Sequence, residues 1–258
     1  MPRSKRTTSS QILHTSDIAK VVGIHPNTVR LYEVWGFISP VPRSPSGYRL
    51  FSPIHLAQIQ IARTALHGPW PGQNIRRSAL ALTRKTATGD FDAALKLAKQ
   101  HLVIVKQERA EAETAARVLE RWASGKTAKK KHRPLKIGEA AKLLHATIDA
   151  IRNWERNGLI SVPRDEHSGY RLYGTAEINR LRVIQMLRQA GYSPMAILRM
   201  LLQLDQGKKK NLRLALDTPR PDEDAYTASD RWLSTLAEQE ARARQMMAQL
   251  KKLVRTKQ

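Results

Sequence analysis

The side chains of this sequence that can do chemistry are mainly cationic. The 258 residues include 45 Lys and Arg against 22 Asp and Glu, a formal charge of +23 with a pI near 10.8. Lysine and arginine displace the counterions that condense on phosphates, and this contribution to binding does not depend on nucleic-acid sequence. The charge therefore favours nucleic acid as the partner, ahead of acidic lipid or of no partner at all.

Residues typical of catalytic and metal sites are missing or scattered. The eight histidines have no metal-ligand spacing, and there is no glycine-rich phosphate loop, triad or carboxylate pair. The lack of cysteine excludes disulfides, thiolate metal sites and thiol redox sensing. We expect a protein that is not an enzyme and needs no cofactor.

Some of the cationic residues recur in an internal repeat. Residues 13–66 align without a gap on residues 135–188, with 13 identities in 54 positions. The identities cluster in two motifs. Arg30-x-x-Glu33 recurs as Arg152-x-x-Glu155, and Gly47-Tyr48-Arg49-Leu50 recurs as Gly169-Tyr170-Arg171-Leu172. The clustering indicates one structural module present twice.

The first copy has the local signals of helix, turn, helix, wing and helix. Thr15 or Ser16 is expected to cap a helix that runs through Val22, with Gly23 in the turn and Pro26 opening the second helix.

That second helix is expected to end at Gly36. Phe37-Ile38 and Tyr48–Phe51 then resemble two short strands around a Pro- and Ser-rich wing. Ser52-Pro53 is expected to open the third helix.

The second copy follows the same plan. Thr147 is expected to cap its second helix, Gly158 to end it and Thr175 to cap its third helix. His145 replaces the turn glycine, and histidine tolerates a left-handed backbone better than bulky apolar residues do. Ser193-Pro194 is expected to start a fourth helix.

Two further segments, 95–119 and 233–254, have apolar heptad seams typical of coiled coils. Arg109 and Glu240 are the charged interruptions of these seams, and antiparallel pairing within one chain would bring them close together. Pairing between two chains, or side chains that reach solvent, is the alternative.

Three motifs of the first copy together resemble the DNA-binding domain of the MerR family, namely Ser16–Lys20, Thr28–Ile38 and Gly47–Phe51. The second copy resembles it through its wing and through Glu177–Leu181 and Ala190–Ser193. The heptad helices resemble the dimerisation helix of that family. Members usually carry one such domain per chain and form homodimers, so a tandem chain departs from the pattern.

The resemblance implies a mainly α fold with two winged helix-turn-helix domains, each with a small β-wing and each followed by a long coiled-coil-type helix. The expected segments are a first domain at 11–85, a coiled-coil helix at 90–123, a basic linker at 124–134, a second domain at 135–205 and a C-terminal coiled-coil helix at 226–255.

The function implied is a sequence-specific transcription regulator that binds double-stranded DNA and distorts a promoter, with RNA polymerase as a candidate partner. The two domains would form an intramolecular pseudo-dimer, which favours a monomer over a homodimer. An architectural or recombination accessory protein of the excisionase type is the alternative, and a basic RNA-associated protein is a third option.

The sequence has no apolar stretch near the length of a membrane helix and no apolar region after its basic start. We therefore expect a bacterial protein that is cytoplasmic, associated with the nucleoid and free of membrane contact.

The resemblance places the reading helices at 25–35 and 147–157, elements that fit the major groove. Arg30 and Arg152 would reach phosphates or base edges, and the wing residues would contact the DNA backbone. The residues expected to bind DNA are Asn27, Thr28, Arg30, Tyr32, Arg43, Tyr48, Arg49, Asp149, Arg152, Trp154, Arg164, Tyr170 and Arg171.

Structural alternatives exist for several of these residues. Arg30 and Arg152 would instead pair with Glu33 and Glu155 on their own helices. Tyr48 and Tyr170 would instead be hydrophobic plugs under the wings. Asp149 either accepts from a cytosine amino group or complements the positive end of its helix.

Overall fold

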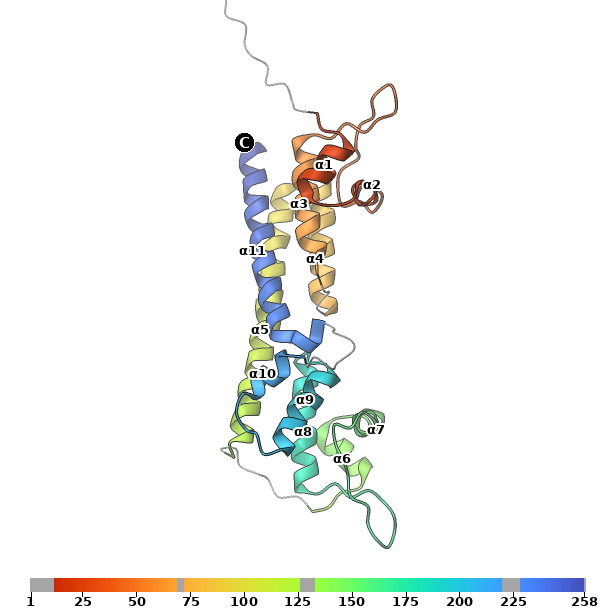
Figure 1. Ribbon diagram of the computed structural model, residues 1–258, viewed down its shortest axis with the longest axis vertical. Coiled ribbons are helices and arrows are strands. Elements are labelled where there is room, and N and C mark those ends of the chain that lie inside the picture. Colours follow the sequence, from red (N-terminus) through yellow and green to blue (C-terminus); the bar gives the residue numbers. More distant parts are fainter. Residues whose placement is uncertain (1–11, 69–71, 126–132, 220–227, 258) are drawn as a thin grey trace, which may run out of the picture. The chain divides into compact units, whose positions relative to one another are not determined.

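The computed structural model describes residues 12–68, 72–125, 133–219 and 228–257, and these residues are mainly helical, as expected (Figure 1). The helices are α1 (Thr15–Val22), α2 (Pro26–Val34), α3 (Pro53–Leu66), α4 (Gln73–Ala87), α5 (Phe91–Ala123), α6 (Ile137–Leu144), α7 (Ile148–Arg156), α8 (Thr175–Gln189), α9 (Pro194–Asp205), α10 (Leu212–Asp217), η1 (Ala228–Arg231) and α11 (Trp232–Lys257). Most of the expected basic linker lies outside the described residues.

The short strands expected beside each wing are reduced to isolated antiparallel bridges. The bridges among the described residues join Leu13 to Phe51, Arg43 to Arg49, Leu135 to Tyr173 and Arg164 to Arg171. Phe37 and Ile38, expected in a strand, are instead buried in the core. We call residues 42–50 and 163–172 the wing segments.

Local chemistry sets the helix ends of the first copy. α1 is capped by His14, and not by Thr15 or Ser16, because the His14 N–H donates to Asp17 Oδ2 at 2.8 Å. Gly23 takes the left-handed conformation at φ 68° that ends α1, and Pro26 opens α2, as predicted. Ser52 caps α3, also as predicted.

The second copy repeats these ends. His145 adopts φ 51° at the position of Gly23, which confirms that the turn keeps its left-handed residue. Thr147 accepts from the Ala150 N–H at 3.0 Å and caps α7, as predicted. The cap of α8 is Gly174 and not Thr175, because the Gly174 N–H donates to Glu177 Oε2.

The chain divides into two compact units. Unit 1 comprises residues 1–105 and 238–258, and unit 2 comprises residues 106–237. The helices α5 and α11 each supply residues to both units.

Unit 1 has two apolar clusters. The first joins α1, α2 and α3 to the segment after α2, around Ile18, Val29 and Phe51. The second joins α3 and α4 to the start of α5 and the end of α11, where Ala98 and Leu250 are members (Figure 1). Residues of both predicted heptad seams therefore contribute to one core.

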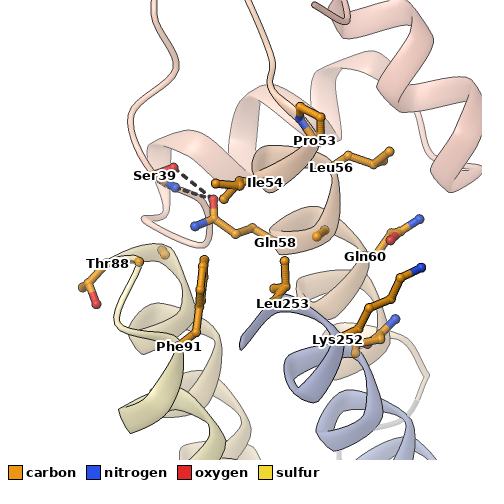
Figure 2. Close-up of a pocket in the computed structure, with 14 residues that line it drawn as sticks. Ser39, Pro53, Ile54, Leu56, Gln58, Gln60, Thr88, Phe91, Lys252 and Leu253 are labelled. Atoms are coloured by element: carbon orange, nitrogen blue, oxygen red, sulfur yellow. Dashed lines mark hydrogen bonds between the residues drawn. The ribbon is translucent and has the colours of Figure 1, made fainter. Parts of the chain in front are cut away.

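The buried amide of Gln58 links the segment after α2 to the last turn of α4. Gln58 accepts from the Ser39 N–H and hydroxyl at 3.0 Å each, and its Nε2 donates to the Thr86 carbonyl at 3.0 Å. A mostly apolar cavity of about 800 Å³ opens beside it, between Ile54, Phe91 and the end of α11 (Figure 2).

Unit 2 packs its second module on the second half of α5 and the start of α11. The buried Tyr192 hydroxyl donates to the Ala112 carbonyl at 3.0 Å, and the Trp232 Nε1 donates to the Ala190 carbonyl at 2.7 Å. Gly191, at φ 95°, lies against the Trp232 ring, where an added Cβ would come within 2.6 Å.

The two charged residues of the predicted seams each have a partner on their own helix. The Arg109 Nε donates to Glu113 Oε1 at 3.1 Å, and Glu240 accepts from Arg244. Because Arg109 belongs to unit 2 and Glu240 to unit 1, their mutual pairing stays a prediction.

The buried His101 predicts a pH-dependent stability of unit 1. Its Nδ1 lies 2.7 Å from the Ser78 hydroxyl, and its Nε2 is buried with no hydrogen-bond partner. Burial lowers the pKa of His101 to about 4. Between pH 6.5 and pH 4 the unfolded chain binds a proton that the folded chain does not, so the free energy of unfolding should fall by about 3 kcal/mol.

His101→Leu should remove this part of the pH dependence, measured by urea unfolding from pH 7 to pH 4. An unchanged slope in the variant would show that His101 is not its origin.

Candidate nucleic-acid interface

The helix α2 buries one side and exposes the other. Val29 and Tyr32 face the core of unit 1, with Thr28 half-buried at the edge. The exposed side carries Asn27, Arg30, Leu31, Val34 and Trp35. The Arg30 Nη1 donates to Asn27 Oδ1 at 3.1 Å, so Arg30 pairs with Asn27 and not with Glu33 in the described structure.

Tyr32 does not lie where the sequence analysis expected. Its side chain is 4% exposed, and its ring packs edge-on against Phe37 with centroids 5.9 Å apart. Burial raises the pKa of its phenol. Tyr32 is three residues from the buried Val29 and so shares its face, which makes it a core residue and not a DNA contact.

Glu33 joins the reading helix to the first wing segment. Its Oε2 accepts from the Arg49 Nε at 2.6 Å and lies 3.6 Å from the Arg43 Nη2, and its Oε1 accepts from the Val41 N–H at 3.2 Å. One carboxylate thus holds three points of the segment that follows α2.

The electrostatics of this contact favour the charged carboxylate. Burial alone would raise the pKa of Glu33, but the hydrogen bonds from Arg49 and Val41 and the positive charges of Arg49 and Arg43 lower it. A lowered carboxyl pKa stabilises the fold above the ordinary pKa of glutamate, and this contribution is lost as the pH falls through the folded value.

The helix α7 presents the same arrangement in unit 2. Ile151 is buried, Trp154 is half-buried, and Arg152 is exposed with its Nη1 at 3.6 Å from Asp149 Oδ1. Glu155 Oε1 accepts from the Arg171 Nε at 2.6 Å, and this hydrogen bond raises the pKa of Arg171.

Arg49 and Arg171 were expected to contact the DNA backbone, but the structure places both in ion pairs with the reading helices. Each Nε is used by the carboxylate, so their main role in the described structure is to position the wing segments. Arg43 and Arg164 lie opposite these two arginines in the wing segments. Backbone β-bridges pair Arg43 with Arg49 and Arg164 with Arg171, and the side chains of Arg43 and Arg164 are exposed.

The wing tyrosines lie at the surface. Tyr48 is 68% exposed and Tyr170 is 61% exposed, with the Lys136 Nζ 5.0 Å from the Tyr170 ring centroid. This exposure contradicts the alternative that they are hydrophobic plugs. The plugs are Phe51 and Tyr173, three residues farther along, which are fully buried.

The gapless alignment of the two copies is wrong within the wing segments. Arg43 bridges to Arg49, whereas Arg164 bridges to Arg171, so the second turn contains one more residue between its bridged positions. The first copy has its extra residue earlier, before Val41-Pro42-Arg43, which matches Val162-Pro163-Arg164.

The role of Glu33 and Glu155 was missed because a bond across 16 residues has no local signal. The repeat nevertheless offered an indirect signal, because the glutamate and the arginine of this pair are both identical in the second copy. Also missed was the exposed apolar end of α2, because no periodicity argument alone says which face of so short a helix is buried.

The part of the chain that the structure describes contains no group of three or more His, Cys, Asp or Glu placed to hold a metal ion. Within the same residues, none of the helices combines the length and apolar character that spanning a bilayer requires.

Comparison with known proteins finds one family model that matches both modules. The family model described as MerR HTH family regulatory protein matches residues 13–78 and 135–204. No solved structure matches the chain.

Three curated relatives carry regulatory names. A probable heavy metal-dependent transcriptional regulator of Haemophilus influenzae is 37% identical over 75 residues, 29% of this chain and 59% of that protein. The HTH-type transcriptional regulator CueR of Escherichia coli is 36% identical over 53 residues, 20% and 39% of the two chains. The mercuric resistance operon regulatory protein of Serratia marcescens is 34% identical over 73 residues, 28% and 50% of the two chains.

The chain thus spans between two fifths and three fifths of the length of these relatives. The family model, in contrast, matches both modules, and its two matched regions together make up more than half of the chain. The chain therefore belongs to the MerR family of helix-turn-helix regulatory proteins.

Proposed function

We propose that the chain is a transcription regulator that binds double-stranded DNA through both modules. The observation that carries this proposal is an arrangement present in both modules. Each of α2 and α7 exposes an arginine, and an ion pair from a glutamate of the same helix joins that helix to its wing segment. The formal charge of +23 supports a polyanionic partner, and the relatives are regulators by name.

The finer part of the proposal concerns assembly. Two reading helices in one chain would meet two half-sites as an intramolecular pseudo-dimer, and distort a promoter for RNA polymerase. The shared core of α5 and α11 residues in unit 1 supports a contact within one chain. Light scattering should then give the mass of one chain for the free protein and of one chain plus one duplex for the complex, whereas two chains in either case would contradict this assembly.

No observation favours the architectural or recombination role, so it is not proposed. The names of two relatives mention metals, but thiolate metal sensing is not proposed because this sequence has no cysteine. A cytoplasmic, nucleoid-associated location is part of the same proposal.

Arg30→Ala and Arg152→Ala should each weaken binding to a selected duplex by about 1–3 kcal/mol, if each arginine makes a base contact. Lys99→Ala and Arg117→Ala remove the same charge from exposed positions of α5 in the two units and serve as matched controls. Fluorescence anisotropy at fixed moderate salt measures all four. Equal affinity of the Arg30 and Arg152 variants and the controls would rule out the assignment.

The selected operator should be asymmetric, because α2 and α7 differ in their exposed residues. Its half-sites should lie about one helical turn, 10–10.5 base pairs, or a multiple apart. Selection from a random duplex pool measures this, and a perfect palindrome would count against it.

Glu33→Gln should destabilise unit 1 by about 1–3 kcal/mol above pH 5, because it removes a charged, partly buried hydrogen bond to Arg49. Affinity for DNA should fall equally for all sequences, since the wing segment is released and the reading residues are intact. Glu238→Gln removes one partner of a surface ion pair on α11 and should have a much smaller effect.

Urea unfolding at pH 7 and pH 4 tests this contact. The difference between wild type and Glu33→Gln should shrink at the lower pH, because below the ordinary pKa of glutamate the unfolded chain binds a proton before the folded Glu33 does. A difference that does not depend on pH would contradict the ion pair.

A further inference from the structure

The exposed faces of the two reading helices are matched in position but not in chemistry. Five positions spaced at three and four residues share one face of a helix. The face of α2 carries Asn27, Arg30, Leu31 and Val34 and continues onto the C-cap residue Trp35. The face of α7 carries Asp149, Arg152, Asn153 and Arg156 and continues onto the C-cap residue Asn157. All ten side chains are exposed.

The second half of the α2 face is apolar. Leu31 is 42% exposed, Val34 is 74% exposed and Trp35 is 50% exposed. Single exposed apolar residues need no explanation, but three that adjoin on one face form a small apolar surface that a ligand could contact.

The ring of Trp35 packs against two neighbouring aromatic rings. Its ring centroid lies 6.3 Å from that of Tyr32 and 5.8 Å from that of Phe37. Because its orientation is set before any ligand arrives, binding would cost little side-chain ordering.

The corresponding half of the α7 face carries only hydrogen-bonding groups. The Asn157 Nδ2 donates to Asn153 Oδ1 at 2.9 Å, and Arg156 is exposed beside them. Asparagine pairs with the edge of adenine and arginine with the edge of guanine, each through two hydrogen bonds.

The thymine C5 methyl is the apolar group that base pairs present in the major groove. We propose that Leu31, Val34 and Trp35 read thymine methyls in one half-site, and that Asn153, Arg156 and Asn157 read the other half-site by hydrogen bonds. This inference rests on the proposed DNA binding.

DNA is favoured over a protein partner for this apolar surface. It shares one helix face with Asn27 and Arg30 in a strongly basic chain. A stable protein interface buries about 1,200–2,000 Å² in total, far more than three side chains of one short helix supply.

The first test uses the full-length chain and the duplex that selection returns. Deoxyuridine replaces thymidine in one half-site at a time, which removes the methyl and keeps every hydrogen-bonding group. In the half-site of α2 each methyl lost should weaken binding about fourfold. In the half-site of α7 the affinity should not change, whereas 7-deazapurines, which lack the N7 acceptor, should weaken binding there.

The second test exchanges the faces. Leu31→Asn/Val34→Arg gives α2 two residues of α7 and leaves Trp35 on its aromatic neighbours, so the fold of unit 1 is kept. This variant should be less sensitive to deoxyuridine than the wild type, because Trp35 is the one methyl reader that it keeps, and it should select a different half-site. Ile12→Ser, which removes an exposed apolar side chain away from α2, is the matched control and should keep that sensitivity.

The outcomes separate this inference from the proposed function. Tight binding without deoxyuridine sensitivity in either half-site overturns the inference and leaves DNA binding intact. A double variant that binds and selects like wild type also overturns it. If selection recovers no duplex, both proposals fail.

Discussion

A carboxylate on each reading helix accepts a hydrogen bond at 2.6 Å from an arginine of the wing segment, Glu33 from Arg49 and Glu155 from Arg171. These partly buried ion pairs fix the angle at which the chain leaves each helix. A helix of nine residues is too short to be stable alone, so its orientation depends on such contacts and on the core beneath it. Loss of Arg49 or Arg171 would remove the nearest cation of a partly buried carboxylate, although Glu33 would keep Arg43 and the Val41 N–H.

The repeat separates what builds the module from what varies on its surface. Both the ion pair and the wing glycine and tyrosine are the same in the two copies, and Ile151 replaces Val29 under α7 as another buried apolar residue. The exposed helix faces of the two copies differ in chemistry, and their wing turns differ in length. A duplicated scaffold with two distinct surfaces can meet two different sequences, which two identical subunits cannot do.

Local features of the fold were predictable from the sequence because their causes are local. Pro26, Gly23 and Thr147 set helix ends through their own backbones or through neighbours within three residues. The caps at His14 and Gly174 were predicted one residue late or more, because the acidic residue three positions on decides them. Tyr32 was misplaced since a short helix does not reveal its buried face, and the role of Arg49 depended on a partner 16 residues away. The register of the wing segments could not be predicted, because only the β-bridges of the structure define it.

The composition of unit 1 has a consequence for how the chain is made. Its core includes Met246 and Leu250 beside Ile61, Leu82 and Ala98, although the whole of unit 2 lies between them in the sequence. During synthesis the ribosome releases the first module long before the segment that completes its core. The partly synthesised chain therefore exposes the apolar residues of α3, α4 and α5 that α11 later covers, and chaperones or proteases can bind such a surface. Covering that surface pays the entropy of a long loop, so unit 1 should finish folding last.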